Sequence, residues 1–172
     1  IRECLSHEGI FGALVSHGSS TVPKHIVDEI NALGGELTNT YGIAVEELQA
    51  AIPCGINKIN VDTDIRLAVT RNMKELFVKY PELRTSASIG EIYELLEAKK
   101  NQFDPRVFLP PIMDTVMKGT IPDEDVAAIV NCVERGVKEV VGTLIVQFGS
   151  FGKAPLVEQV TLEEMIERYK KI

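Results

Sequence analysis

Two short apolar runs in the first third of the chain have the pattern of buried β-strands. Residues 9–16 and 55–61 are rich in β-branched and other apolar side chains, and each run is bounded by glycine or polar residues. Between them, Pro23 opens an amphipathic helix that ends at Gly34–Gly35, and a shorter helix follows. Because such a crossover normally joins parallel strands with right-handed connectivity, this region is expected to form a βαβ unit.

Beyond the second strand the hydrophobic periodicity becomes helical. Residues 64–81 place apolar side chains along one helical face until Pro81 ends the pattern. Residues 88–100 carry acidic side chains early and lysines late, which suits a helix dipole. Residues 104–119 predict a third helix, interrupted by Pro110–Pro111.

The last part of the chain predicts two more helices. Pro122 opens a long one over residues 123–149, whose later part is rich in Val and Ile, so a strand there is the alternative interpretation. A final helix is predicted over residues 162–172, after the glycine-containing segment 149–155.

The predicted elements include too few strands for a complete sheet, since two strands cannot make a sheet with protected edges. The chain also begins at Ile1, within a helical pattern, rather than at Met. We therefore expect a fragment of a larger α/β protein, or a piece that pairs with strands from elsewhere.

Composition narrows the functional classes. The 172 residues are 45% hydrophobic and 25% charged, typical of a folded, soluble domain. The formal net charge of −7 argues against nucleic-acid binding, while small anions remain compatible with local amides and basic residues. No apolar run is long enough for a membrane span or a signal core. Three widely spaced cysteines favour a reducing cytoplasm over a disulfide framework.

Candidate chemistry follows the first predicted strand. His17 stands at its carboxyl end, Gly18 permits a tight turn, and residues 19–21 bring hydroxyls and amides to the start of the helix opened by Pro23. Taken alone, this pattern is explained slightly better by a serine-rich cap with a solvent-facing histidine. The other histidines lack metal-ligand spacing to His17 and are expected on the surface.

A second polar segment follows the second predicted strand. Thr63 or Asp64 would cap the next helix, but capping does not explain Asn60, whose amide needs a partner if buried. Loops that follow parallel strands meet at one edge of the sheet, where α/β barrels place their phosphate site. Arg66 and Arg106 are candidates for holding a second anionic group, although isolated arginines are usually solvated.

These segments resemble the carboxyl-terminal third of class II, zinc-dependent fructose-bisphosphate aldolases. The resemblance runs with gaps from about Leu14 to the end and rests on VSHGSSTVP, GG, GINKINVDTD, FDPR and FGSFGKA. It implies a TIM (β/α)8 barrel, of which this chain would supply the last two βα units. Residues 1–81 would be the βαβα barrel segment with its phosphate loops, and residues 82–172 a helical insert and carboxyl-terminal extension of one partial domain.

The resemblance also assigns roles to residues. His17 would be one of three zinc ligands, Asn60 would contact the substrate near the reacting carbons, and a monovalent cation could accompany the zinc. The sugar phosphate nearer the zinc would contact Gly18, Ser20, Asp62 and Thr63. Arg66 and Arg106 would bind the distal phosphate, Arg106 from across a subunit interface in a homo-oligomer, a dimer or tetramer.

The implied reaction is the reversible cleavage of fructose 1,6-bisphosphate in glycolysis and gluconeogenesis. The proton-transferring aspartate and the other two zinc histidines precede residue 1 in the family's order, so the isolated chain is expected to be inactive. Residues 85–102 and 121–146 are expected to depart from the family pattern as insertions. Two alternatives stay open: a tagatose-bisphosphate aldolase, and a non-catalytic module that binds phosphate or serves assembly.

Overall fold

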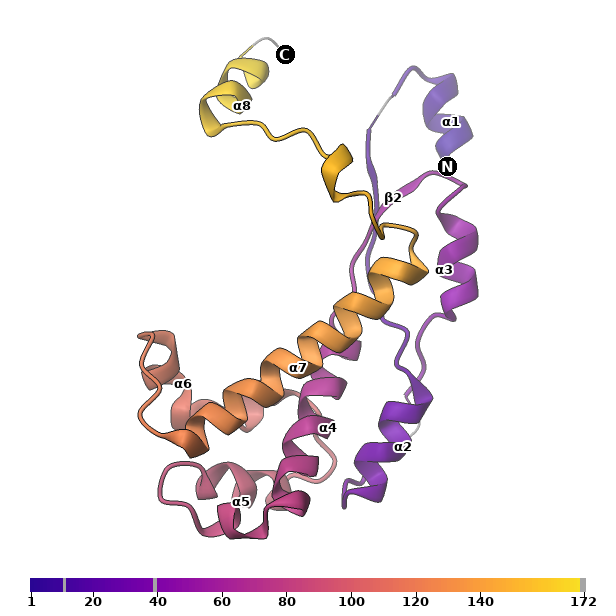
Figure 1. Cartoon of the computed structure of the whole chain (residues 1–172). Helices are drawn as coiled ribbons and strands as arrows, with labels where there is room; N and C mark the ends of the chain where they lie inside the picture. The colour runs from indigo at the N-terminus through magenta and orange to yellow at the C-terminus, as the bar shows by residue number, and fades with distance from the viewer. Residues whose placement is uncertain (11, 39, 171–172) are drawn as a thin grey trace.

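The chain folds into a two-stranded parallel sheet followed by a group of helices (Figure 1). A computed structural model describes residues 1–10, 12–38 and 40–170. Its strands are β1 (Leu14–Ser16) and β2 (Ile56–Ile59). Its α-helices are α1 (Arg2–His7), α2 (Lys24–Ala32), α3 (Val45–Ala51), α4 (Thr63–Lys79), α5 (Gly90–Ala98), α6 (Pro110–Met117), α7 (Glu124–Gln147) and α8 (Leu162–Tyr169). Short 3-10 helices are η1 (Pro81–Thr85), η2 (Pro105–Val107) and η3 (Ala154–Leu156).

The parallel pairing of β1 with β2 confirms the βαβ prediction, but both strands are shorter than predicted. The guanidinium of Arg2 connects the segments that lead into the two strands. It donates to the carbonyl oxygens of Gly12 and Gly55, each at 2.9 Å. Within the part of the chain that the structure describes, neither strand pairs with a third one, so each has a free edge.

Most of the hydrophobic core lies between the helices. The long helices α4 and α7 cross in close contact, and α2 packs against the other side of α4. The contact is close because Gly136 of α7 has no side chain: a Cβ there would lie 2.8 Å from the backbone nitrogen of Val69 on α4. The largest side chains buried in the core are Phe77, Phe108, Ile30, Leu67, Met73, Ile89, Ile92, Leu96 and Ile129.

Two helical predictions are refined by the structure. Pro110 and Pro111 do not interrupt a helix: they form the first turn of α6, where a missing N–H is tolerated, and the preceding segment is η2. The alternative of a strand late in residues 123–149 was wrong, because α7 is one continuous helix of 24 residues. Its buried positions recur with helical spacing at Val126, Ile129, Cys132, Gly136 and Val140.

The last helix, α8, lies apart from the other helices (Figure 1). Thr161 and Glu164 form a capping box that starts α8, whose residues are all exposed. Among the described residues no helix combines the length and the apolar character that crossing a membrane requires. All three cysteines are free, as their spacing predicted, and Cys132 is the buried one.

Candidate functional site

The two parallel strands bring the two predicted polar loops to the same edge of the sheet. The first loop (residues 17–23) leads from β1 into α2, and the second loop (residues 60–62) leads from β2 into α4. The backbone N–H of Asn60 donates to the carbonyl oxygen of Ser16 at 3.0 Å, which continues the ladder one step beyond the strands. The predicted residues of the two loops therefore face each other as neighbours.

His17 and Asn60 lie side by side. The Asn60 amide nitrogen is 3.1 Å from Nδ1 of His17, within hydrogen-bond distance. Rotation of the amide by a half-turn would place its oxygen against Nδ1 and free Nε2 to act as a ligand. The role of Asn60 as a contact of the imidazole was not apparent from the sequence.

Ser20 of the first loop caps the helix that follows the second loop. Its Oγ accepts hydrogen bonds from the backbone N–H groups of Asp62 and Thr63, at 3.1 and 3.0 Å. The prediction that Thr63 or Asp64 caps this helix was wrong, because no side chain within the helix or its N-cap does so. Ser20 keeps its own hydroxyl hydrogen, which remains available to donate to a ligand.

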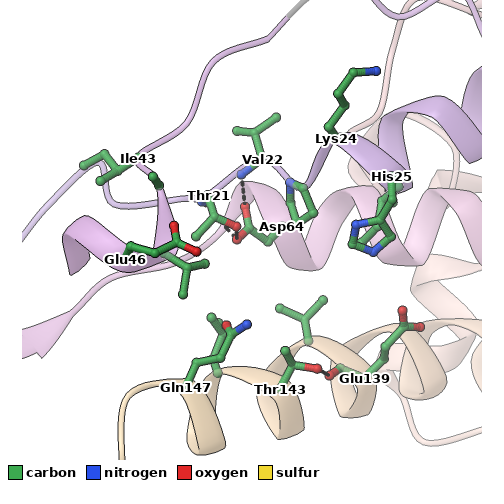
Figure 2. A pocket seen from close by; sticks show the side chains of 16 residues that line it. Thr21, Val22, Lys24, His25, Ile43, Glu46, Asp64, Glu139, Thr143 and Gln147 are labelled. Carbon is green, nitrogen blue, oxygen red and sulfur yellow. Dashed lines mark hydrogen bonds between the residues drawn. The ribbon is translucent and has the colours of Figure 1, made fainter. Parts of the chain in front are cut away.

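Asp64 of α4 in turn holds the first loop in place. Its buried carboxylate accepts the N–H of Thr21 at 3.0 Å, the hydroxyl of Thr21 at 2.7 Å and the N–H of Val22 at 2.8 Å, the bonds drawn in Figure 2. These bonds stabilise a backbone in which Val22 has a φ of 49°, a conformation that β-branched residues rarely adopt. Gly18, with a φ of 67°, makes the tight turn that was predicted.

The two candidate arginines meet at a shared carboxylate. Arg66 donates to Asp104 at 2.7 Å and also forms an ion pair with Asp62. Arg106 donates to the same Asp104 from Nη2 at 2.6 Å and from Nε at 3.0 Å. The structure therefore connects the second loop, α4 and η2 in one charged network.

Hydrogen bonding from the Arg106 side chain is the main reason that the pKa of Asp104 is lowered to about 2, and the charge of Arg66 adds to this effect. The carboxylate is thus ionised at neutral pH and holds both guanidinium groups. Asp104 was missed in the sequence, where its only signal was its place in FDPR beside Arg106.

Metal-binding groups are sparse. Among the described residues, no three His, Cys, Asp or Glu side chains gather closely enough to hold a metal ion. His17 is the imidazole at the carboxyl edge of the sheet, while His7 and His25 are exposed elsewhere, as predicted. The described residues thus offer one imidazole for a metal and not a complete ligand set.

A cavity of about 430 Å³ lies close to the first loop but belongs to a different surface. It is enclosed by the starts of α2 and α3 and by the last turns of α7, where Thr143 and Gln147 face it (Figure 2). None of the eight predicted site residues is among its lining residues. Those eight lie instead at the edge of the sheet and around η2.

These features define an α/β protein with a cluster of polar side chains where two parallel strands end. The model of the family described as fructose-bisphosphate aldolase class-II matches residues 2–153. The chain belongs to the class II fructose-bisphosphate aldolase family.

Individual relatives agree with the family match. The chain is 35% identical over 158 residues to a fructose-bisphosphate aldolase of Nostoc sp., covering 92% of this chain and 33% of the relative. It is 34% identical over 157 residues to that of Giardia intestinalis, covering 91% and 36%. A class 2 enzyme of Synechocystis is 33% identical over 158 residues, covering 92% and 33%. The chain thus spans about a third of the length of these relatives.

Proposed function

We propose that this chain supplies the phosphate-binding part of a class II fructose-bisphosphate aldolase. The complete gene product would cleave fructose 1,6-bisphosphate reversibly to dihydroxyacetone phosphate and glyceraldehyde 3-phosphate. The observation that carries the proposal is the meeting of the His17–Asn60 pair with the Ser20–Thr63 contact at one edge of a parallel sheet. Family membership adds independent support.

We infer that β1 and β2 are two neighbouring strands of a TIM barrel, the seventh and eighth. Three features support the barrel: the parallel pairing, the helices that follow each strand, and the free edge on each strand. In such a barrel the two loops would lie at the carboxyl-terminal face, where phosphate sites recur.

The phosphate nearer the reacting carbons would lie between the two loops. Ser20 would donate its hydroxyl hydrogen, and the positive φ of Gly18 would let the backbone approach the ligand closely. The N–H groups of Asp62 and Thr63 already donate to Ser20, so they would hold that serine in place and polarise it.

The distal phosphate would be bound by Arg66 and Arg106. In the structure both guanidinium groups are held by Asp104, which keeps them close together and limits their rotation. A phosphate that displaces this carboxylate in part would find two preorganised bidentate donors. In a homo-oligomer, Arg106, whose side chain is 69% exposed, would be free to serve a neighbouring subunit.

His17 fits the role of one zinc ligand. Its Nδ1 contacts an amide that can orient the ring, as outer partners of metal-bound histidines commonly do, and the ring is solvent-accessible. Two further histidines would have to come from residues outside this chain, as would the proton-transferring carboxylate. When bound, zinc supplies a Lewis acid that polarises the substrate ketone. Asn60 would hold the imidazole and donate to a substrate oxygen near the bond that breaks.

The test uses the complete gene product, with fructose 1,6-bisphosphate as substrate. We expect cleavage that is lost on chelation and restored by zinc. His17→Ala should lower kcat/KM at least about a hundredfold and reduce bound zinc, whereas His25→Ala, an exposed histidine on α2, should change neither. Cleavage that survives zinc removal, or full zinc stoichiometry in His17→Ala, would contradict the proposal.

The same experiment separates the alternatives. Faster turnover of tagatose 1,6-bisphosphate than of the fructose sugar would identify the stereochemical variant. Phosphate binding by the complete protein without cleavage of either sugar would favour the non-catalytic module. Light scattering during gel filtration would test the proposed dimer or tetramer.

A further inference from the structure

A second pocket lies at the other end of α4 from the sheet edge. It has a volume of about 260 Å³ and is enclosed by the end of α2, the last turns of α4, η1 and α5. Its walls are largely apolar, with Leu33, Phe77 and Leu96 among them. Its lining shares no residue with the two loops at the sheet edge and includes neither Arg66 nor Arg106, so the pocket lies apart from the proposed aldolase site.

A buried amine lies in the wall of this pocket. Lys74 is only 4% exposed, and its Nζ has no hydrogen-bond partner among the residues that the structure describes. Leaving a buried polar group without a partner is costly, so native proteins nearly always provide one. Burial lowers the pKa of the Lys74 amine, against the opposing attraction of Glu97.

The charged groups around the pocket are not balanced. Arg84 lines it as a second cation, held by a bond of 2.9 Å from its Nε to the carbonyl of Phe77 and by the ring of Tyr93, 5.3 Å away. The one carboxylate in the lining belongs to Glu97, and it already pairs with Lys100 at 3.7 Å. An anion placed between Lys74 and Arg84 would supply the missing negative charge.

We propose that this pocket binds a small organic carboxylate. The carboxylate group would accept hydrogen bonds from Lys74 and Arg84, and the apolar part of the ligand would contact Leu33, Phe77 and Leu96. A purely inorganic anion would leave the apolar walls without contacts, which is why an organic acid fits better. Because the amine is closed off from the pocket in this structure, the terminal methylene groups of Lys74 would have to rotate to bring it to the ligand.

A bound carboxylate would favour the charged form of the amine. The titratable and charged groups around Lys74 are Arg84 from η1, Tyr93 and Glu97 from α5, and Lys100 beyond it, while the end of α2 contributes none to the lining. Because burial lowers the pKa of Lys74 and a bound carboxylate opposes that change, carboxylate binding should weaken as the pH rises through the pKa of the amine.

Titration calorimetry of the complete gene product tests the proposal, with benzoate as the probe and benzamide as its uncharged counterpart. We expect benzoate to bind, and benzamide to bind at least tenfold more weakly. Lys74→Met should weaken benzoate binding at least about tenfold. Lys79→Met, an exposed lysine on the same helix, should leave it unchanged.

A second variant guards against a folding defect in Lys74→Met. Ala32→Leu, at the end of α2, would fill the pocket without touching the amine and should also abolish benzoate binding. Both variants should keep the cleavage of fructose 1,6-bisphosphate, if the complete protein has it, because neither residue lies at the sheet edge. No benzoate binding by the unmodified protein, or binding that survives both variants, would overturn the proposal and leave water as the partner of the amine.

Discussion

The sheet and the helical group of this protein are built in opposite ways. In the sheet, three or four residues pair on each strand, and Val15 is 42% exposed. In the helical group, side chains such as Met73, Phe77 and Ile129 are at most 1% exposed. The predicted site residues of the two loops lie at the sheet, which is the more sparsely packed of the two regions. Its geometry is therefore held less by hydrophobic burial than by individual bonds from side chains to backbone.

Those bonds join residues that are far apart in the sequence. Arg2 fixes the start of the two strands, while Ser20 and Asp64 fix the loops where the strands end. The helical group also has such contacts, for example from Asn72 to the carbonyl oxygen of Cys132, but the burial of its apolar side chains adds a stabilisation that is non-directional. The comparison suggests that the two regions differ in stability as well as in packing, with functional loops drawn from the less stable part.

The largest expected effect tests whether the helical group contributes more to the free energy of unfolding than the sheet does. Phe77→Ala should lower the free energy of unfolding by about 3–5 kcal/mol, because it empties a fully buried site. Val15→Ala, on the exposed strand, should cost about 1 kcal/mol or less. Urea unfolding followed by circular dichroism measures both. Equal losses would mean that the sheet is as well consolidated as the helices.

A smaller effect tests the crossing of α4 and α7. Gly136→Ala should cost about 1–3 kcal/mol, since the new Cβ would press against the backbone of Val69. Gly142→Ala lies on the same helix in open space and should instead stabilise it by about 0.5–1 kcal/mol. Thermal unfolding of the pair measures the difference. A loss in both variants would point to α7 itself and not to the crossing.

The smallest effect concerns the charged network that joins the two regions. Because the pKa of folded Asp104 is lowered to about 2, below its ordinary value near 4, its contribution to stability is complete above about pH 4. That contribution is lost as the pH falls from about 4 to about 2. An NMR titration of the Asp104 carboxyl carbon should show its midpoint near pH 2, and Arg106→Gln should raise it. A midpoint near 4 in the unmodified protein would show that the network does not form.

Local sequence patterns predicted the elements well and their limits less well. The helical spacing of apolar residues was sufficient for α4, α5 and α7, because each buries one face. The strands are shorter than predicted, and the carbonyl oxygens just before them accept hydrogen bonds from Arg2, 10 and 53 residues away in sequence. A long-range side-chain contact of this kind leaves no trace in hydrophobic periodicity.

For the candidate site, too, the sequence predicted the positions of residues better than their long-range contacts. That His17 and Asn60 lie at the carboxyl ends of neighbouring strands followed from the order of the elements. That Ser20 would cap a helix more than forty residues away, and that Asp104 would hold two arginines, depended on tertiary placement. Motif resemblance located the polar positions, whereas the structure supplied their partners.

The exchange between Ser20 and Asp64 has a consequence for protein engineering. The first loop is held by Asp64 of α4, and the start of α4 is capped by Ser20 of the first loop, so neither is a self-contained unit. Transplanting the first loop alone into another α/β scaffold would leave the N–H groups of Thr21 and Val22 without their acceptor. A successful graft has to carry both loops and the first turn of α4 as a single module.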